Sequence, residues 1–289
     1  MSERPWGLID LHAHSAVSDG TETPGELVRL AFAAGLGTVA ITDHDATSGW
    51  AEATLAARET GMNLIPGMEF STRNFGYSVH LLAYLFDPAD AALTDEMATI
   101  RAERFSRAEK IVERISMDYD LNWDDVLEHS TPGATIGRPH IADALIAKGH
   151  VVDRAEAFDS ILHPRTPYYA PHYAPALKDA IELVRAAGGV PVLAHPATNT
   201  RGGLIPREVV AQLVDAGLAG LEIDHRENTA PGKTWLRQLA VEFDLVVTGS
   251  SDWHGSGKPN LLGENTTTTE SLERIVAIAT GSAPVTTWS

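Results

Sequence analysis

Short apolar runs and longer amphipathic stretches alternate along both ends of the chain. The apolar, β-type runs lie near residues 7–11, 37–42, 63–67, 79–86, 190–194, 219–224 and 245–249. Stretches with the helical spacing of apolar residues lie between and after them, at 24–34, 48–60, 176–187, 206–216, 231–242 and 269–279. Because repeated strand–helix units with short loops build a parallel sheet or a closed barrel, the pattern predicts an α/β fold.

The first of these helices has clear end signals. Thr23-Pro24-Gly25-Glu26 has the form of a capping box with proline at the first helical position. Gly35 is the expected stop.

The middle of the chain lacks strand patterns and predicts helices alone. A long charged helix is expected over 93–117, and shorter ones near 122–128, 139–148 and 153–160. Loops on the catalytic rim of a barrel accept insertions. We therefore expect a barrel made of residues 1–92 and 171–289, with 93–170 as an inserted helical subdomain that covers the active site. The alternating charges of the long helix favour a solvated surface with ion pairs over a nucleic-acid face.

Composition limits the classes of partner. The 289 residues are 44% hydrophobic and carry a net charge of −17, which argues against binding long duplex nucleic acid. There is no membrane-length apolar stretch, and the first residues do not resemble a secretory signal. Cysteine is absent, which excludes thiolate ligands and fits a reducing compartment. We expect a cytoplasmic protein, and the composition gives no oligomeric state.

Histidines and carboxylates follow most of the apolar runs. They include His12-Ala13-His14, Asp43-His44-Asp45, Glu69, His195 and Asp252-Trp253-His254, with Asp19 in a turn and His80 within a run. Alternation along a strand points both side chains of His-x-His to one side, where they can bind one ion. Each element has a plain structural alternative, such as an Asx turn for Asp19 or a core histidine for His80. Together they predict a metal-binding rim.

These motifs resemble a known family. The segments that carry the likeness are Asp10–Ser15, Ser18–Gly20, Ile41–Asp45, Pro66–Phe70, Val79–Leu82, Leu193–Pro196 and Ser250–His254. They are similar to the motifs of the PHP (polymerase and histidinol phosphatase) metal-dependent phosphoesterases, over most of the chain outside the insert. Gly137–Ala142 and Pro167–Tyr169 resemble the stand-alone bacterial branch, which includes nucleotide and nucleoside-bisphosphate phosphatases.

The resemblance implies a distorted (β/α)7 barrel and three divalent metal ions. His12, His14, Glu69 and Asp252 would hold the first ion. Glu69 would bridge to a second, completed by His80 and His195. Asp19, His44 and His254 would hold the third. All nine positions are filled, which favours an active enzyme over a structural relic of the kind found in some polymerases.

This donor set suits phosphate ester hydrolysis. Nitrogen and oxygen ligands without thiolate suit Mn²⁺, Fe²⁺ or Zn²⁺. A metal-bound water has its pKa lowered to about 7, so that hydroxide is available, and the ions neutralise the phosphoryl oxygens. Among the ligands we expect catalysis to depend most on Asp252, Glu69 and His254.

Three other residues are candidates for binding the substrate's phosphates. Arg138 precedes a helix of the insert, Arg165 lies in a later loop of the insert, and His225 follows a barrel strand. Related sequences often read Tyr-His-Pro where this chain reads Asp224-His225-Arg226. The departure leaves the substrate open.

The sequence therefore predicts a metal-dependent phosphoesterase that hydrolyses small phosphorylated metabolites, foremost nucleoside mono- or bisphosphates. Two alternatives stay open. One is a 5′-end-trimming exonuclease on short RNA, and the other is a metal-bound interaction domain without turnover.

Overall fold

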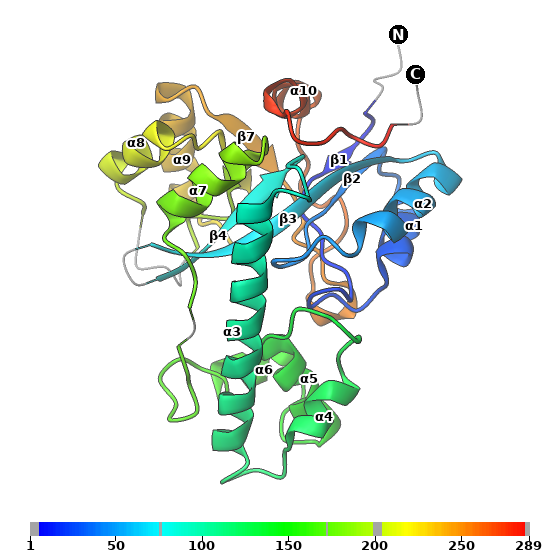
Figure 1. Cartoon of the computed structure of the whole chain (residues 1–289), viewed down its shortest axis with the longest axis vertical. Helices are drawn as coiled ribbons and strands as arrows, with labels where there is room; N and C mark the ends of the chain where they lie inside the picture. The colour runs from blue at the N-terminus through cyan, green and yellow to red at the C-terminus, as the bar shows by residue number, and fades with distance from the viewer. Residues whose placement is uncertain (1–5, 75–76, 172, 199–203, 287–289) are drawn as a thin grey trace.

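Within the described residues, seven strands lie side by side in the order in which they occur along the chain, and the first four can be followed in Figure 1. The computed structural model describes residues 6–74, 77–171, 173–198 and 204–286. Its strands are β1 (Ile9–Asp10), β2 (Thr38–Ile41), β3 (Asn63–Asn74), β4 (Tyr77–Tyr84), β5 (Val190–Leu193), β6 (Gly220–Asp224) and β7 (Val246–Gly249). The predicted strands are confirmed in number and order.

The sheet curves until its first and last strands nearly meet. The chain after β7 runs beside the chain after β1, where Asp252 N–H donates to the His12 carbonyl at 2.9 Å and His14 N–H to the Trp253 carbonyl at 2.8 Å. These bonds bring together residues about 240 positions apart in sequence. The fold is thus a nearly closed seven-stranded α/β barrel, as expected.

The predicted run of parallel strands is wrong at one place. β4 is antiparallel to both β3 and β5, whereas the other neighbours are parallel. β3 is also longer than its apolar run: residues 63–66 pair with β2 and residues 67–74 pair with β4. Glu69 therefore lies inside a strand, just past the point where β3 changes partner, and not at a strand end as the sequence suggested.

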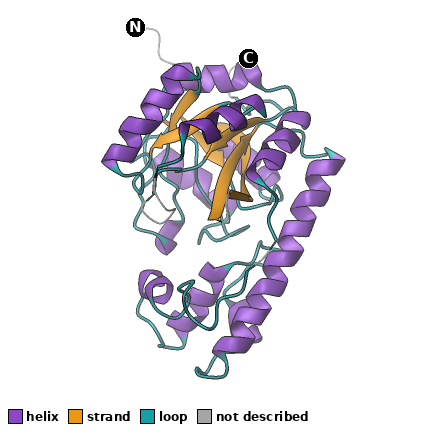
Figure 2. Ribbon diagram, turned by 90° about the vertical axis from the view of Figure 1, so that its left-hand side faces the viewer, coloured by secondary structure: helices purple, strands orange, loops and turns teal. Residues whose placement is uncertain are grey.

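Helices cover the outside of the barrel (Figure 2). They are α1 (Pro24–Ala33), α2 (Trp50–Thr60), α7 (Leu177–Ala186), α8 (Arg207–Asp215), α9 (Ala230–Glu242) and α10 (Thr269–Ile278). The capping box of α1 is confirmed: the Thr23 hydroxyl accepts from Glu26 N–H, and the Glu26 carboxylate accepts from Thr23 N–H. Gly35 follows the helix with a φ of +86°, a left-handed conformation that glycine adopts without strain.

The helical insert lies below the barrel, and one long helix runs from the barrel into it (Figures 1 and 2). This helix is α3 (Ala91–Ile115), and it is followed by α4 (Trp123–Glu128), α5 (Arg138–Ala147) and α6 (Arg154–Asp159). Leu93, Met97 and Ile100 of α3 pack in the barrel core, while its later apolar residues, from Ala108 on, pack in a separate core with α4, α5 and α6. One helix therefore serves both cores, and the expected boundary at residue 93 stays a prediction.

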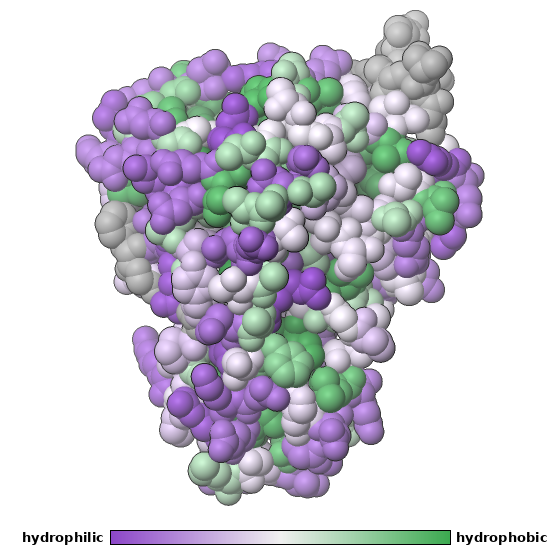
Figure 3. Space-filling view, viewed as in Figure 1, coloured by the Kyte–Doolittle hydropathy of each residue, from purple (hydrophilic) through white to green (hydrophobic). Residues whose placement is uncertain are grey.

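One face of the molecule is mostly polar. Hydrophilic residues predominate on the face shown in Figure 3. No helix in the described part of the chain has the length and hydrophobicity needed to cross a membrane.

Tyr84 ties β4 to the segment directly after β1, and loss of its hydroxyl tests this packing. Its hydroxyl is fully buried and donates to the Leu11 carbonyl at 2.8 Å. Tyr84→Phe should lower the free energy of unfolding by about 1–3 kcal/mol, because the carbonyl loses a buried partner. Urea denaturation measures this. Tyr77→Phe is the matched control, since Tyr77 is 53% exposed and should give no change. Equal midpoints for Tyr84→Phe and wild type would contradict the role.

Candidate metal centre

All nine side chains predicted as ligands lie together at one end of the barrel. His12, His14 and Asp19 come from the segment after β1, and His44 follows β2. Glu69 and His80 lie within the paired strands β3 and β4, and the remaining three follow β5 and β7. Eight of the nine are buried, and the His80 side chain is 24% exposed. The fold therefore gathers residues from six separate segments into one polar cluster.

Glu69 is the centre of the cluster. Its Oε2 lies 3.2 Å from His12 Nε2, 3.1 Å from His14 Nε2 and 3.4 Å from His44 Nδ1. Its Oε1 lies 2.7 Å from His80 Nδ1 and 3.2 Å from His195 Nε2. The two oxygens thus face two different sets of imidazoles, which is the arrangement of a carboxylate that bridges two cations.

Two aspartates extend the cluster on the other side of His14. Asp252 Oδ1 lies 3.3 Å from His12 Nε2 and 3.4 Å from His14 Nε2. Asp19 Oδ1 lies 3.3 Å from His254 Nε2, and its Oδ2 lies 3.8 Å from His44 Nε2. His44 therefore stands between two carboxylates, and His14 lies near three, those of Asp19, Glu69 and Asp252.

Backbone conformation aims two of these side chains. Asp252 has a φ of +56° and His195 a φ of +30°, in the left-handed region that residues other than glycine seldom adopt. Both residues come shortly after a strand has ended. Such conformations cost about 1–3 kcal/mol and concentrate at functional sites, where the surrounding structure holds them.

Glu222, which the sequence analysis did not single out, holds two of the histidines in place, while Asp43 and Asp10 tie together the loops that carry the cluster. Glu222 on β6 contacts His12 Nδ1 at 3.0 Å and accepts from His195 N–H at 2.8 Å. Asp43 accepts from Ser15 and Ser18, and Asp10 accepts from Ser251 N–H and Gly263 N–H. A carboxylate on the far ring nitrogen fixes the tautomer and orientation of a ligating histidine. The available signal for Glu222 was a charged residue within an apolar strand run.

The electrostatics of the cluster follow from buried charges of opposite sign. Burial alone would raise the pKa of Glu69 and of Asp19, but the surrounding histidines hold the pKa of both carboxyls well below its usual range. Burial lowers the pKa of His14, but Asp252 and Glu69 overcome it and raise that pKa to about 9. The carboxylates thus stay ionised, and positive charge close to them stabilises this form.

The residues present fit divalent cations. Within the described residues, four groups of three or four buried or nearly buried His, Asp and Glu side chains place ligand atoms within 4.8 Å of one another. One is His12, His14, Glu69 and Asp252, the set expected for the first ion. His12 Nε2 and His14 Nε2 are 3.0 Å apart, which matches two ligands on one ion with bonds of about 2.1 Å. His44 Nδ1 and His80 Nδ1 approach Glu69 without hydrogen-bond geometry. Ring nitrogens that lie this close to a carboxylate without a hydrogen bond are placed as ligands of a shared cation would be.

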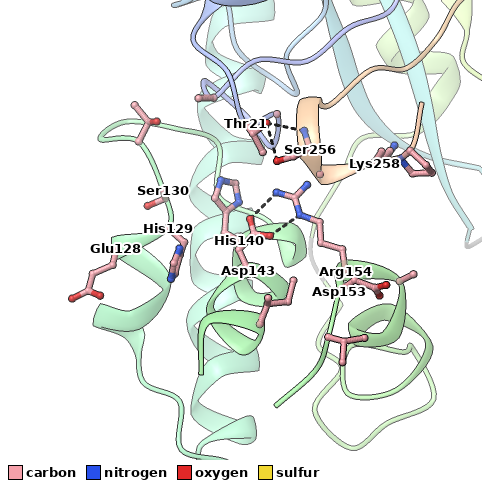
Figure 4. Close-up of a pocket in the computed structure, with 18 residues that line it drawn as sticks. Thr21, Glu128, His129, Ser130, His140, Asp143, Asp153, Arg154, Ser256 and Lys258 are labelled. Carbon is pink, nitrogen blue, oxygen red and sulfur yellow. Dashed lines mark hydrogen bonds and ion pairs between the residues drawn. The ribbon is translucent and has the colours of Figure 1, made fainter. Parts of the chain in front are cut away.

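A cleft between the barrel and the insert lies close to the cluster, lined by Gly20, next to Asp19, and by Lys258 (Figure 4). The cleft has a volume of about 950 Å³, and its lining includes Thr21, His140, Asp143, Arg154 and Lys258. Lys258 Nζ lies 2.7 Å from Asp252 Oδ2, so it adds positive charge at the edge of the cluster. Arg154 pairs with both carboxylate oxygens of Asp143 through two of its nitrogens. It also donates to the Asp19 carbonyl at 3.0 Å, and this bond joins the insert to the barrel loop that contains Asp19.

The three residues predicted to bind phosphate lie in different places. His225 is buried beside the cluster, with Nε2 3.6 Å from Asp252 Oδ2. Arg138 lies within the insert, where it donates to the Leu162 carbonyl at 3.2 Å and stacks over Phe158. Arg165 is exposed on a loop of the insert. The fold thus brings His225 to the cluster, whereas Arg138 and Arg165 stand apart from it. Lys258, which the sequence analysis missed, is in contact with Asp252.

Known proteins resemble both the sequence and the fold. A family model described as the PHP domain matches residues 10–88. The chain is 32% identical to the 3′,5′-nucleoside bisphosphate phosphatase of Chromobacterium violaceum, over 86% of this chain and 88% of that protein. It is also 32% identical to a 5′-3′ exoribonuclease of Haemophilus influenzae, over 85% of this chain and 89% of the relative.

A solved structure extends the likeness to the whole fold. A protein of Bifidobacterium adolescentis, described as a metal-dependent phosphoesterase, superimposes with a TM-score of 0.93 at 42% identity, over 96% of this chain and 98% of the other. The alignment therefore covers the insert as well as the barrel. The sequence, the barrel and the buried His, Asp and Glu cluster agree, and the chain belongs to the PHP-domain metal-dependent phosphoesterases.

Proposed function

We propose that this phosphoesterase removes a phosphate from nucleoside mono- or bisphosphates. The observation that carries the proposal is the Glu69 carboxylate, which has imidazoles on both oxygens. A cleft lies close by, and its lining residue Lys258 contacts Asp252 of the cluster. The relatives named for a nucleoside bisphosphatase and an exoribonuclease support a nucleotide as the substrate.

We assign the nine side chains to three ions, of Mn²⁺, Fe²⁺ or Zn²⁺. The first site would use His12, His14, Glu69 and Asp252, the second Glu69, His80 and His195, and the third Asp19, His44 and His254. Divalent cations bound here would supply Lewis-acid charge and lower the pKa of water, so that a nucleophile is available at neutral pH. The short contacts of Glu69 with His80 and of Asp19 with His254 support this grouping.

The protein's own groups orient the reactants. Lys258 brings a positive charge to the edge of the cluster, where phosphoryl oxygens need countercharge. His225, buried on the same side, is a second candidate contact. We keep the prediction that catalysis would depend most on Asp252, Glu69 and His254. Asp252 and Glu69 each lie against both His12 and His14, and His254 lies against Asp19.

A second candidate function is trimming of short RNA from its 5′ end. The cleft of about 950 Å³ beside the cluster has room for more than a phosphate group, and one relative is named a 5′-3′ exoribonuclease. The acidic surface disfavours long nucleic acid but not short oligonucleotides. Membership of a hydrolase family argues against the alternative of a metal-bound domain without turnover.

A substrate panel with controlled metal tests the proposal. Protein stripped with chelator and then loaded with Mn²⁺ should release phosphate from nucleoside mono- and bisphosphates and from an aryl phosphate, and chelation should abolish this. Phosphate release and nucleoside products are measured on equal amounts of enzyme, with a short 5′-phosphorylated RNA in parallel. Turnover that survives complete chelation would refute the metal-dependent reaction. Cleavage of RNA alone would favour the exonuclease.

Glu222→Gln tests whether Glu222 holds His12 and His195 in position to bind metal. The substitution keeps the size of the side chain but weakens its bonds to His12 and to His195 N–H. Metal affinity should fall about 10- to 100-fold, and activity should return at higher metal concentration. Titration of chelated protein measures this. Glu242→Gln is the matched control, because Glu242 pairs with Arg207 on the exposed surface. An affinity equal to wild type in Glu222→Gln would exclude the supporting role.

Metal stoichiometry tests the third site. Elemental analysis of saturated wild-type protein should give three ions per chain. Asp19→Ala should give two, since Asp19 lies against both His44 and His254 and the third site would keep only neutral ligands. Two ions in wild type, with no change on substitution of Asp19, would show that the third site does not exist.

A further inference from the structure

Arg154 of the insert reaches the barrel loop that contains Asp19. It lies on α6, and its Nη1 donates to the Asp19 carbonyl at 3.0 Å. Asp143 on α5 anchors the same guanidinium, since its carboxylate accepts from Nε at 2.7 Å and from Nη2 at 2.6 Å (Figure 4). The Arg154 side chain is only 13% exposed. An arginine held at two points on the insert therefore presents its third nitrogen to the barrel.

The same guanidinium lies against the loop that follows His254. The short helix η2 (Gly255–Gly257) begins directly after this histidine, and Gly257 N–H donates to the His254 carbonyl at 3.2 Å. A Cβ atom at position 257 would lie 2.2 Å from Arg154 Nη1, so glycine leaves the space that the guanidinium occupies. Arg154 thus packs between two barrel loops, one that carries Asp19 and one that carries His254.

These two loops face each other across the proposed third metal site. Asp19 Oδ1 lies 3.3 Å from His254 Nε2, and its Oδ2 lies 3.8 Å from His44 Nε2. Among the described residues, Arg154 is the single hydrogen-bond donor to the Asp19 carbonyl. The position of the Asp19 backbone, and with it of the carboxylate, therefore depends in part on the insert.

A second bond joins the insert to the same loop. Thr135 N–H, just before α5, donates to the Val17 carbonyl at 2.9 Å. Arg154 and Gly257 both line the cleft between barrel and insert, so these contacts lie at its wall. Movement of the insert away from the barrel would break both bonds to the loop that contains Asp19.

We propose that Arg154 is a positioning residue that couples the third metal ion to the docking of the insert on the barrel. The inference rests on the three-ion assignment in the proposed function. With the insert docked, Arg154 holds Asp19 and His254 where one ion can bind both. Because linkage is reciprocal, an ion bound there stabilises the docked insert by the same free energy. Asp143 balances the charge of Arg154, so the guanidinium stands near a cation without adding net positive charge.

Metal titration tests the effect of the insert on the ion. Chelator-stripped protein is titrated with Mn²⁺, and bound ions are counted by elemental analysis at each free concentration. Arg154→Gln cannot reach from Asp143 to the Asp19 carbonyl. It should weaken binding of the third ion about 10- to 100-fold, as for loss of a group that supports a ligand, and leave the first two ions unchanged. A third ion bound as tightly as in wild type overturns the proposal.

Gly257→Ala removes the same contact without removing a charge. Its methyl group would take the place of Arg154 Nη1, so it should also weaken the third ion. In the double variant the two effects should not add, because both act through one contact. Fully additive effects would show that the alanine acts without Arg154 and would overturn the shared role. Thermal unfolding verifies that each variant is folded.

Hydrogen exchange tests the effect of the ion on the insert. The Thr135 amide reports docking, since its partner is the Val17 carbonyl of the barrel. Filling of the third site should slow exchange of this amide in wild type. The slowing should be smaller in Arg154→Gln, even when metal saturates the variant. Equal slowing in both proteins would contradict the coupling. Neither this readout nor the titration needs turnover.

Lys148→Gln is the matched control. Lys148 ends α5 and pairs with Asp125 at 3.1 Å, so the substitution removes an ion pair that lies wholly within the insert. The variant should keep the wild-type affinity for the third ion. An equal loss of affinity in Lys148→Gln would mean that any loosening of the insert suffices, and the specific role of Arg154 would be refuted.

The ion count and the turnover assay separate this proposal from the proposed function. Two ions in saturated wild type overturn the coupling, even if the protein hydrolyses phosphoesters. Three ions without any turnover refute the proposed function, and the coupling is then judged on titration and exchange alone.

Discussion

The burial of so many ionisable groups around one carboxylate is the constraint on which the rest of the structure depends. Glu69 lies inside β3, where a charged group without partners would cost several kcal/mol. Five imidazoles surround it, and Glu222 in turn fixes the orientation of the His12 ring. The barrel brings these groups together because its strand ends converge at one rim. Reversal of β4 adds His80 from within a strand.

The sequence predicted the elements well because hydrophobic periodicity decides where strands and helices lie. The position of polar residues after buried strands predicted a metal-binding rim, and the resemblance to the PHP family supplied the full set of nine side chains. The direction of β4 was not predictable, since an apolar run has the same pattern in either direction. Glu69 was misplaced for a related reason: β3 continues through polar residues once β4 pairs with it.

Contacts between distant segments explain what the sequence analysis missed. Glu222 reaches His12 across 210 residues, and Arg104 reaches Asp45 across 59. Lys258 is only six residues from Asp252, yet a single lysine in a loop of glycine, serine and proline has no pattern that marks it.

The shared helix α3 has a consequence for how this protein can change over time. Ile100 packs in the barrel core and Ala108 in the insert core. Arg104 and Arg107 lie between them along the helix. Each residue added to or removed from this stretch turns everything beyond it by about 100° and shifts it by about 1.5 Å. The number of residues between the two cores therefore fixes how the insert is rotated and placed relative to the barrel. Their identities can change wherever the side chain is exposed, but a change in their number would rotate one core against the other, so the constraint on length here is mechanical rather than chemical.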